Sequence, residues 1–183
     1  QIFRSLIACF KEKPQLNFLW SASHNTMENV SVEAGLSNLP KNVIFEPWMP
    51  LNDLMRAGRI QLLIFHGGTK TLMEALNAKV PVITLAFKND QYRISDMIEK
   101  RGLGHYIPIP ELTPKKLCFS IDSLLYGSER TAIIKRLAAS GDAISAEIFN
   151  SEKIVNVWMR RTVNNAHQRS RIWRQNLPKD AWL

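Results

Sequence analysis

Two largely apolar runs, each as long as a β-strand and each followed by a helix-patterned segment, constrain the fold of this chain most. The runs lie at 61–65 and 81–87, and the segments that follow them lie at 69–77 and 90–100. An apolar run without alternation is typical of a parallel strand that is buried on both faces. We therefore expect an α/β fold, a Rossmann-like open parallel sheet with helices on both faces.

The rest of the chain fits the same alternation. Short runs of apolar residues predict additional strands, and apolar residues at helical spacing predict additional helices. A polar, turn-rich stretch at 23–41 predicts a surface loop. The additional strands are expected at 17–21, 42–46 and 105–109, the last of them at a sheet edge, and the additional helices at 2–10, 52–55, 113–125, 128–139 and 145–163.

The length of 183 residues, with 45% of them apolar, suits one buried core better than two. We expect a single domain at 1–163 and a basic tail at 164–183. The formal net charge is +8, and much of the excess lies toward that tail. A positive charge favours an anionic partner of some kind. The tail itself is interpreted as a docking arm or as a frayed end.

The two cysteines, Cys9 and Cys118, lie far apart, and both fall in apolar helical patterns. This placement favours buried free thiols over a disulfide framework. We expect no signal peptide, and no apolar run approaches the ~20 residues that a membrane-spanning helix needs. It starts without Met inside a helical pattern, which suggests a piece of a longer protein.

A ligand site is expected where the buried strands end, because open parallel sheets bind ligands outside the carboxyl ends of their strands. The segments at that edge are 66–71 and 88–91. Gly67 and Gly68 allow the backbone to approach a ligand closely, and the helix that begins near Thr69 presents free N–H groups and a positive dipole end. These features together favour a phosphate group.

Six short motifs occur in a fixed order around this edge. They are Trp48-Met49-Pro50, Asn52-Asp53-Leu54, His66-Gly67-Gly68, Glu74-Ala75, Val80-Pro81 and Asp90-Gln91. Together they resemble the signature of the UDP-glucuronosyltransferase and UDP-glycosyltransferase family. The resemblance implies a GT-B glycosyltransferase, which has two facing Rossmann-like domains and holds the UDP-sugar chiefly in the C-terminal one. This chain resembles most of that C-terminal domain, without the first strand, which would precede Gln1.

The resemblance also implies roles for individual residues. Trp48 would stack on uracil, His66 would hydrogen-bond the diphosphate, and Glu74 would accept hydrogen bonds from the ribose hydroxyls. Asp90 and Gln91 would bind hydroxyls of the transferred sugar, although Asp90 could also cap the following helix. The complete set of residues expected to bind the UDP-sugar is Trp48, Leu51, His66, Gly67, Gly68, Thr69, Lys70, Thr71, Glu74, Asp90 and Gln91.

Two members of this set depart from the family pattern. Leu51 stands where the family usually has Gln, which removes an amide that helps to hold the nucleoside. Lys70 stands where many members have Asn beside the phosphates, and its ammonium could pair with phosphate charge or point into solvent.

By resemblance, the reaction is an inverting transfer of a sugar from UDP to a small lipophilic acceptor. The general base would be a His oriented by an Asp in the N-terminal domain, so no catalytic residue is expected in this chain. No metal and no cofactor are implied, since the UDP-sugar is a co-substrate. The acceptor would bind through the absent N-terminal domain. The family places such proteins at the endoplasmic reticulum membrane, and membrane association would come from segments that this chain lacks.

Three alternatives remain open from the sequence. The chain could be a non-catalytic nucleotide-sugar-binding or regulatory domain. It could also belong to another GT-B enzyme, such as a sterol or lipid glycosyltransferase or a UDP-sugar epimerase, although the Trp-x-Pro and Asp-Gln motifs argue against an epimerase. In the third, the tail contacts RNA or an acidic membrane through Arg169, Arg171, Trp173 and Arg174. No nucleic-acid partner is expected.

Overall fold

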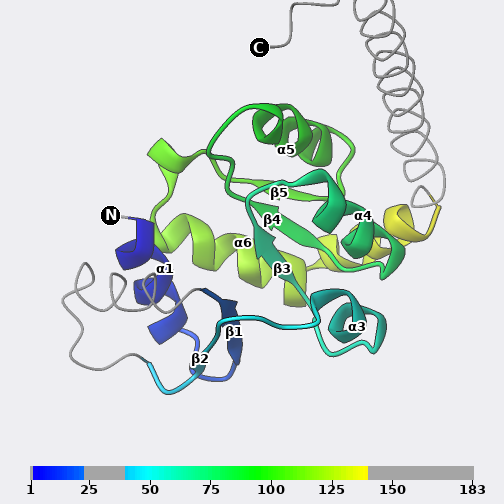
Figure 1. The fold of residues 1–183 in the computed structure, drawn as a ribbon. Coiled ribbons are helices and arrows are strands. Elements are labelled where there is room, and N and C mark those ends of the chain that lie inside the picture. Colours follow the sequence, from blue (N-terminus) through cyan, green and yellow to red (C-terminus); the bar gives the residue numbers. More distant parts are fainter. Residues whose placement is uncertain (1, 23–39, 140–183) are drawn as a thin grey trace, which may run out of the picture. The chain divides into compact units, whose positions relative to one another are not determined.

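The computed structural model describes residues 2–22 and 40–139 (Figure 1). These residues belong to one compact unit, Gln1–Asp142. The predicted domain boundary at 163, the helix at 145–163 and the basic tail at 164–183 lie outside the described residues and stay predictions. Most of the loop expected at 23–41 also lies outside them.

Strands and helices alternate along the described chain, as the sequence predicts. The three-residue strands β3 and β4 are shorter than the apolar runs that contain them, because only the last three residues of the first run and residues 82–84 of the second join a ladder. The elements are α1 (Ile2–Lys11), β1 (Phe18–Ser21), β2 (Val43–Glu46), α3 (Leu51–Arg56), β3 (Leu63–Phe65), α4 (Thr69–Asn77), β4 (Val82–Thr84), α5 (Asp90–Lys100), β5 (Gly104–Tyr106), the 3-10 turn η1 (Ile109–Glu111) and α6 (Pro114–Tyr126). A last helix occupies 128–139.

All five strands pair in parallel, and they form two sheets within the described residues. The pair β1–β2 forms one sheet, and the order β3-β4-β5 forms the other, with β5 at an edge as expected. A doubly wound sheet places its first strand between its second and its fourth. The resemblance implies that β1 and β3 correspond to the second and fourth strands of such a sheet. The gap between β1 and β3 is therefore the place of the first strand, which this chain lacks.

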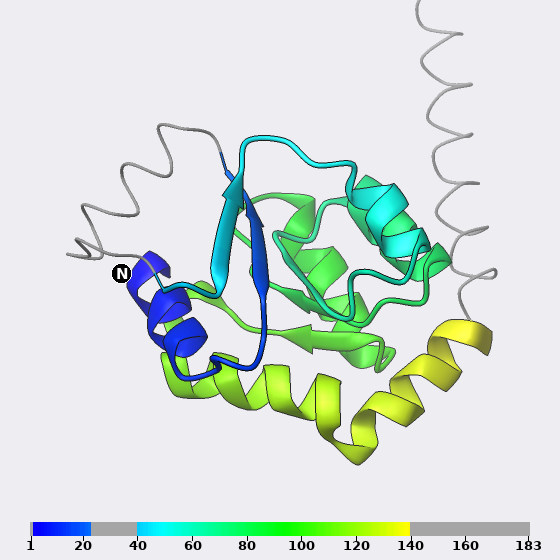
Figure 2. The same ribbon diagram turned by 90° about the horizontal axis from the view of Figure 1, so that it is seen from below.

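Helices cover both faces of the three-stranded sheet. Figures 1 and 2 show α6 on one face and α4 and α5 on the other. The central strand β4 is buried along its whole length, which explains why its run is apolar without alternation. The core between these layers consists of fully buried aliphatic side chains, among them Leu72, Leu76, Ile83, Ile98, Leu117, Ile121 and Leu124. The α/β class with parallel strands and helices on both faces is confirmed.

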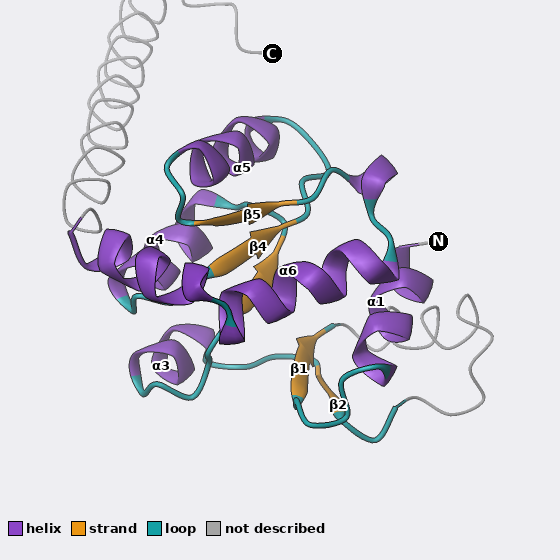
Figure 3. Ribbon diagram, turned by 180° about the vertical axis from the view of Figure 1, so that it is seen from behind, coloured by secondary structure: helices purple, strands orange, loops and turns teal. Residues whose placement is uncertain are grey.

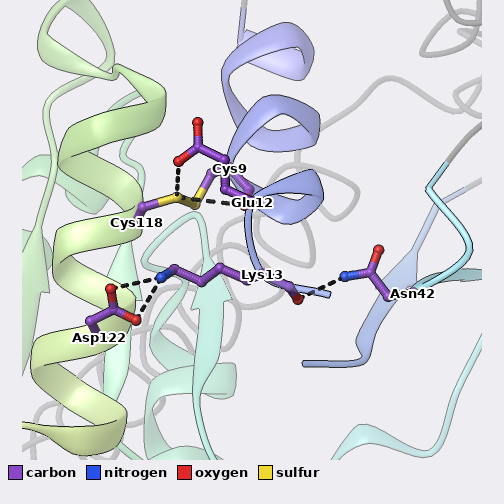
Figure 4. A network of polar contacts seen from close by, with 6 residues as sticks. All are labelled: Cys9, Glu12, Lys13, Asn42, Cys118 and Asp122. Carbon is purple, nitrogen blue, oxygen red and sulfur yellow. Dashed lines mark hydrogen bonds and ion pairs between the residues drawn. A yellow bond between two sulfur atoms is a disulfide. The ribbon is translucent and has the colours of Figure 1, made fainter. Parts of the chain in front are cut away.

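The prediction of free thiols is wrong, because Cys9 and Cys118 form a disulfide between α1 and α6 (Figure 4). Both residues are buried, as expected. The two helices lie side by side (Figure 3), which brings the two Cα atoms to 5.5 Å, a separation that a disulfide can span. The cysteines are 109 residues apart in sequence, so their pairing depends on tertiary packing that no local pattern reports.

A second link joins α6 to the segment just after α1. The Lys13 ammonium lies 2.6 Å from Oδ1 and 2.7 Å from Oδ2 of Asp122. Asn42, just before β2, points its Nδ2 at three carbonyl oxygens, each 3.0 Å away, which belong to Phe10, Lys13 and Leu16. These bonds satisfy carbonyl groups where α1 ends and tie the helix to the sheet formed by β1 and β2.

Candidate functional site

The two segments expected to form the site start at the same sheet edge. Strands β3 and β4 are neighbours, and their last residues, Phe65 and Thr84, are partners in the ladder. The segment that follows β3 runs through His66, Gly67 and Gly68 into α4, and the segment that follows β4 runs through 85–89 into α5. Both segments leave the carboxyl ends of adjacent parallel strands, where such sheets bind ligands.

Gly67 makes the contact between the two segments. Its φ of +88° lies in the left-handed region that favours glycine. A Cβ built on Gly67 would lie 2.9 Å from Ser95 Oγ and 3.3 Å from the Gln91 carbonyl oxygen. The turn therefore packs directly on the start of α5, and any side chain at position 67 would be both strained and obstructed. This contact brings the His-Gly-Gly and Asp-Gln motifs together.

His66 lies along the turn on the side of Gly68. A Cβ built on Gly68 would lie 2.6 Å from His66 Nε2, so the imidazole covers the Gly68 backbone closely. The ring also meets Phe65 edge-on, with 6.0 Å between the ring centroids. His66 is exposed, and within 2–22 and 40–139 no hydrogen bond or ion pair engages its ring nitrogens. Its ring nitrogens can therefore meet a ligand at the turn.

The N-terminus of α4 carries free hydrogen-bond donors. Gly68 is its N-cap residue, so no side chain caps the helix, and the first turn holds no acidic residue. The first three helical residues are Thr69, Lys70 and Thr71, whose backbone N–H groups have no partner inside the helix. Lys70 is exposed, and both threonines are half-buried. An uncapped helix start with a cation beside it is suited to an anion.

Glu74 follows Lys70 by one turn on α4 and is half-buried. This spacing permits an ion pair on a helix surface. Among the described residues, however, neither side chain forms one. Both charges thus remain available to a ligand.

The loop before α5 is braced by the side chains at the start of that helix. Gln91 Oε1 accepts hydrogen bonds from the backbone N–H of Phe87 at 2.9 Å and of Lys88 at 3.2 Å. The Tyr92 hydroxyl donates to the Phe87 carbonyl at 2.8 Å. The side-chain oxygen of Gln91 is therefore occupied, whereas its amide NH₂ is not used in these contacts.

Asp90 is exposed and is the first residue of α5. The alternative role of N-cap belongs to Asn89, whose φ of 52° makes it one of two non-glycine residues with positive φ in the described chain. The Asp90 carboxylate therefore remains open to solvent at the helix start.

Trp48 and Leu51 lie on a different segment, between β2 and α3. Trp48 is 75% exposed, which excludes a role in packing the core of this unit. Leu51 is half-buried as the first residue of α3, and α3 packs against α4. The close contacts between the turn and α5 do not extend to these two residues.

Two structural partners of the site carry little sequence signal. Ser95 is completely buried, and it follows Gln91 by one helical turn, so helix spacing alone could have placed it on the same face. Tyr92 braces the loop from the next position along α5.

His105 lies outside this site. Its Nε2 is 3.1 Å from Glu129 Oε1, and Ser123 donates to the other oxygen of that carboxylate.

Comparison with known proteins decides the family. The model of the erythromycin biosynthesis protein CIII-like C-terminal domain matches residues 26–149, more than half of the chain. The chain belongs to this family. It is accordingly a UDP-glycosyltransferase homologue over the C-terminal, donor-binding region, and the resemblance predicted from the motifs is confirmed.

Individual relatives agree with this assignment. UDP-glucosyltransferase 2 of Dactylopius coccus is 27% identical over 138 residues, covering 75% of this chain and 25% of that protein. UDP-glucosyltransferase YojK of Bacillus subtilis is 28% identical over 115 residues, covering 61% of this chain and 28% of that protein. This chain thus spans about a quarter of the length of such relatives.

Solved structures give the fold. The crystal structure of Os79 from O. sativa in complex with UDP matches with a TM-score of 0.66 and 18% identity, covering 80% of this chain and 36% of that chain. The matching structures are GT-B glycosyltransferases.

Within residues 2–22 and 40–139, no group of three or more His, Cys, Asp or Glu side chains could hold a metal ion. No helix in the same part of the chain is both long and apolar enough to cross a bilayer.

Proposed function

We propose that this domain binds a UDP-sugar, with the diphosphate at the N-terminus of α4. The observation that carries the proposal is the uncapped start of α4 on a Gly-Gly turn that packs against α5. A diphosphate is a compact dianion or trianion, and free backbone N–H groups with a positive dipole end are suited to it. Lys70 adds a cation at the same place, where charge-assisted hydrogen bonds are strong.

The remaining predicted residues fit around that anchor. Glu74 is the carboxylate that would accept bonds from the ribose, one turn further along α4. Trp48 offers an exposed aromatic face for uracil. Leu51 can add only apolar contact, because it carries no amide. The other contributors at the turn are His66, Gly67, Gly68, Thr69 and Thr71.

The transferred sugar would meet Asp90 and Gln91 at the start of α5. Since Gln91 Oε1 already accepts two backbone hydrogen bonds, we infer that Gln91 serves the sugar as a donor through its NH₂ group. Asp90 would serve as the acceptor. This division of roles matches a sugar hydroxyl, which both donates and accepts.

We further propose an inverting transfer in which this domain stabilises the leaving group. Negative charge develops on UDP as the glycosidic bond breaks, and His66, the α4 N–H groups and Lys70 surround the position proposed for it. Deprotonation of a small lipophilic acceptor requires a general base. No catalytic residue is assigned to this chain, so that base and the acceptor site belong to another domain, and the chain alone would bind donor without turnover. No metal or cofactor is part of the proposal.

The disulfide bears on where the domain works. Disulfides form and persist in oxidising compartments and are rare where thiols are kept reduced. The Cys9–Cys118 disulfide therefore supports an oxidising compartment, and the lumen of the endoplasmic reticulum implied by the family resemblance is one such compartment.

The test is calorimetric titration of the 183-residue chain with UDP, UDP-glucose and UDP-glucuronic acid. We expect micromolar to millimolar binding that is weakened in Trp48→Ala and in His66→Ala. Phe119→Ala is the matched control, because Phe119 is an equally exposed aromatic residue on α6. Absence of binding by a folded wild-type chain would refute the proposal and favour a domain that has lost donor binding.

A further inference from the structure

Ser95 differs from the other buried polar side chains of the described residues in its hydrogen bonding. It is completely buried, and its Oγ is the one buried side-chain nitrogen or oxygen in the described residues that has no hydrogen-bond partner. A buried hydroxyl without a partner has lost its bonds to water and gained none in the protein, which lowers stability. Such a group calls for a partner that the unliganded protein does not supply.

The position of this hydroxyl points to the turn between β3 and α4. A Cβ on Gly67 would lie 2.9 Å from Ser95 Oγ, so the hydroxyl lies directly against the turn. The His66 ring lies against the next residue, Gly68. The uncapped start of α4 follows at once. A free donor is thus buried against the backbone that leads into the proposed diphosphate site.

The turn also contains two consecutive glycines, whose peptide can adopt more than one orientation. Two consecutive glycines let the peptide between Gly67 and Gly68 rotate at low cost. The N–H and C=O of one trans peptide point in opposite directions. A rotation that aims the Gly68 N–H at a phosphate oxygen therefore turns the Gly67 carbonyl away from the ligand, and Ser95 is the buried donor beside Gly67.

We propose that Ser95 is a positioning residue of the donor site, whose hydroxyl bonds to the Gly67 carbonyl only when the diphosphate is bound. This inference rests on the proposed function. The bond forms in the loaded state and is absent in the unliganded one. Ser95 thereby holds the Gly68 N–H in the orientation that binds phosphate, and it does so without touching the ligand.

Loss of the Ser95 hydroxyl should weaken UDP binding without lowering the stability of the unliganded chain. Ser95→Ala removes a hydroxyl that is unpartnered without ligand, so the free energy of unfolding of the unliganded chain should stay unchanged or rise. The same variant loses a hydrogen bond in the loaded state. Its Kd for UDP should therefore rise by about 3- to 10-fold, the range that one net hydrogen bond supplies.

Ser5 provides the matched control. It is also a buried serine, but its Oγ already donates to the Leu112 carbonyl at 3.4 Å. Ser5→Ala should lower the stability of the unliganded chain and leave the Kd for UDP unchanged. The same change from serine to alanine should thus affect UDP binding at position 95 and stability at position 5.

The experiment is calorimetric titration of the full chain with UDP, together with urea unfolding without ligand, for wild type, Ser95→Ala and Ser5→Ala. Weaker UDP binding with unchanged or increased stability in Ser95→Ala supports the proposal. Wild-type affinity in Ser95→Ala, or a loss of affinity that accompanies a loss of stability, overturns it while the proposed function stands. Absence of UDP binding by folded wild type overturns the proposed function and this inference together.

Discussion

Lys13, just past the end of α1, and Asp122 on α6 form a two-point ion pair beside the disulfide between α1 and α6. The ammonium is 2.6 Å and 2.7 Å from the two carboxylate oxygens. Lys13 follows Cys9 by four residues and lies just past the end of α1, and Asp122 follows Cys118 by four residues on α6, so the ion pair lies next to the disulfide (Figure 4). The Lys13 side chain is only 9% exposed. Asp122 therefore neutralises a charge that is nearly buried.

Removal of Asp122 should destabilise the domain. Asp122→Ala leaves the buried Lys13 ammonium unpaired, and we expect a loss of about 1–3 kcal/mol, which allows for the 49% exposure of the Asp122 side chain. Urea unfolding measures the change. The control is Asp96→Ala, which breaks the exposed Lys100–Asp96 pair within α5 and should lower stability by less than about 0.5 kcal/mol. Equal losses in the two variants would contradict the structural interpretation.

Reduction of the disulfide should lower stability further. Closure of a loop of this length corresponds to about 4–5 kcal/mol in the chain-entropy description. A reductant should therefore shift the unfolding midpoint of the wild-type chain to lower urea. Cys9→Ala should unfold at that lower midpoint with or without reductant. An unshifted wild-type midpoint after complete reduction, verified by thiol titration, would argue against this stabilising role.

Gly67→Ala should harm both the fold and the site. Strain in the left-handed region and the collision with Ser95 together predict a loss of about 2–5 kcal/mol. Gly58 provides a measure of the backbone strain alone, because it has a φ of +68° and a Cβ added to it would meet no other atom. Gly58→Ala should lose only about 1–2 kcal/mol and bind UDP as wild type does. Unfolding and UDP titration of both variants decide between strain and collision.

Lys70 should contribute electrostatic attraction to the diphosphate. Lys70→Gln is expected to weaken UDP binding by about 3- to 10-fold at low salt, and the difference from wild type should shrink as salt screens the pair. The control is Lys79→Gln, just beyond the opposite end of α4. A salt-independent effect, or none, would indicate that the Lys70 ammonium points into solvent.

Acid should weaken the contacts that Glu129, on the last helix, makes with β5 and α6. Hydrogen bonding by Ser123 and contact with His105 hold the pKa of Glu129 below its ordinary value of 4.5, while partial burial opposes them. A depressed pKa means that the ionised carboxylate stabilises the folded state above pH 4.5 and that this contribution is lost as the pH falls through the lower folded pKa. Glu129→Gln should flatten the decline of stability in that acidic range. The exposed Glu46→Gln control should retain the wild-type profile.

Local patterns predicted the parts of this protein that local chemistry determines. The run that became β4 is apolar throughout because helices cover both of its faces. The start of α4 could be placed because the Gly-Gly turn and the helical pattern meet at Thr69. The meeting of the turn with the Asp90-Gln91 segment followed from the rule that parallel strands end at one edge.

Features set by tertiary packing were beyond the reach of the sequence. Cys9 and Cys118 were predicted as free thiols because neither spacing nor composition reveals that α1 and α6 touch. The engagement of Gln91 Oε1 with the preceding loop depends on a backbone path with a positive φ at Asn89. Ser95 attracts notice only once its hydroxyl is seen to lack a partner.

The division of the strands into two sheets bears on how this chain behaves in concentrated solution. Within the described residues, β1 is paired only with β2, and β3 only with β4. Each therefore presents one side of unpaired N–H and C=O groups, and such strand edges are templates for the strands of other molecules. The chain should associate with itself as its concentration rises, and light scattering would follow that association. Charged or proline substitutions at outward-facing positions of β1 should suppress it, so that the titrations above can be performed on a monodisperse sample.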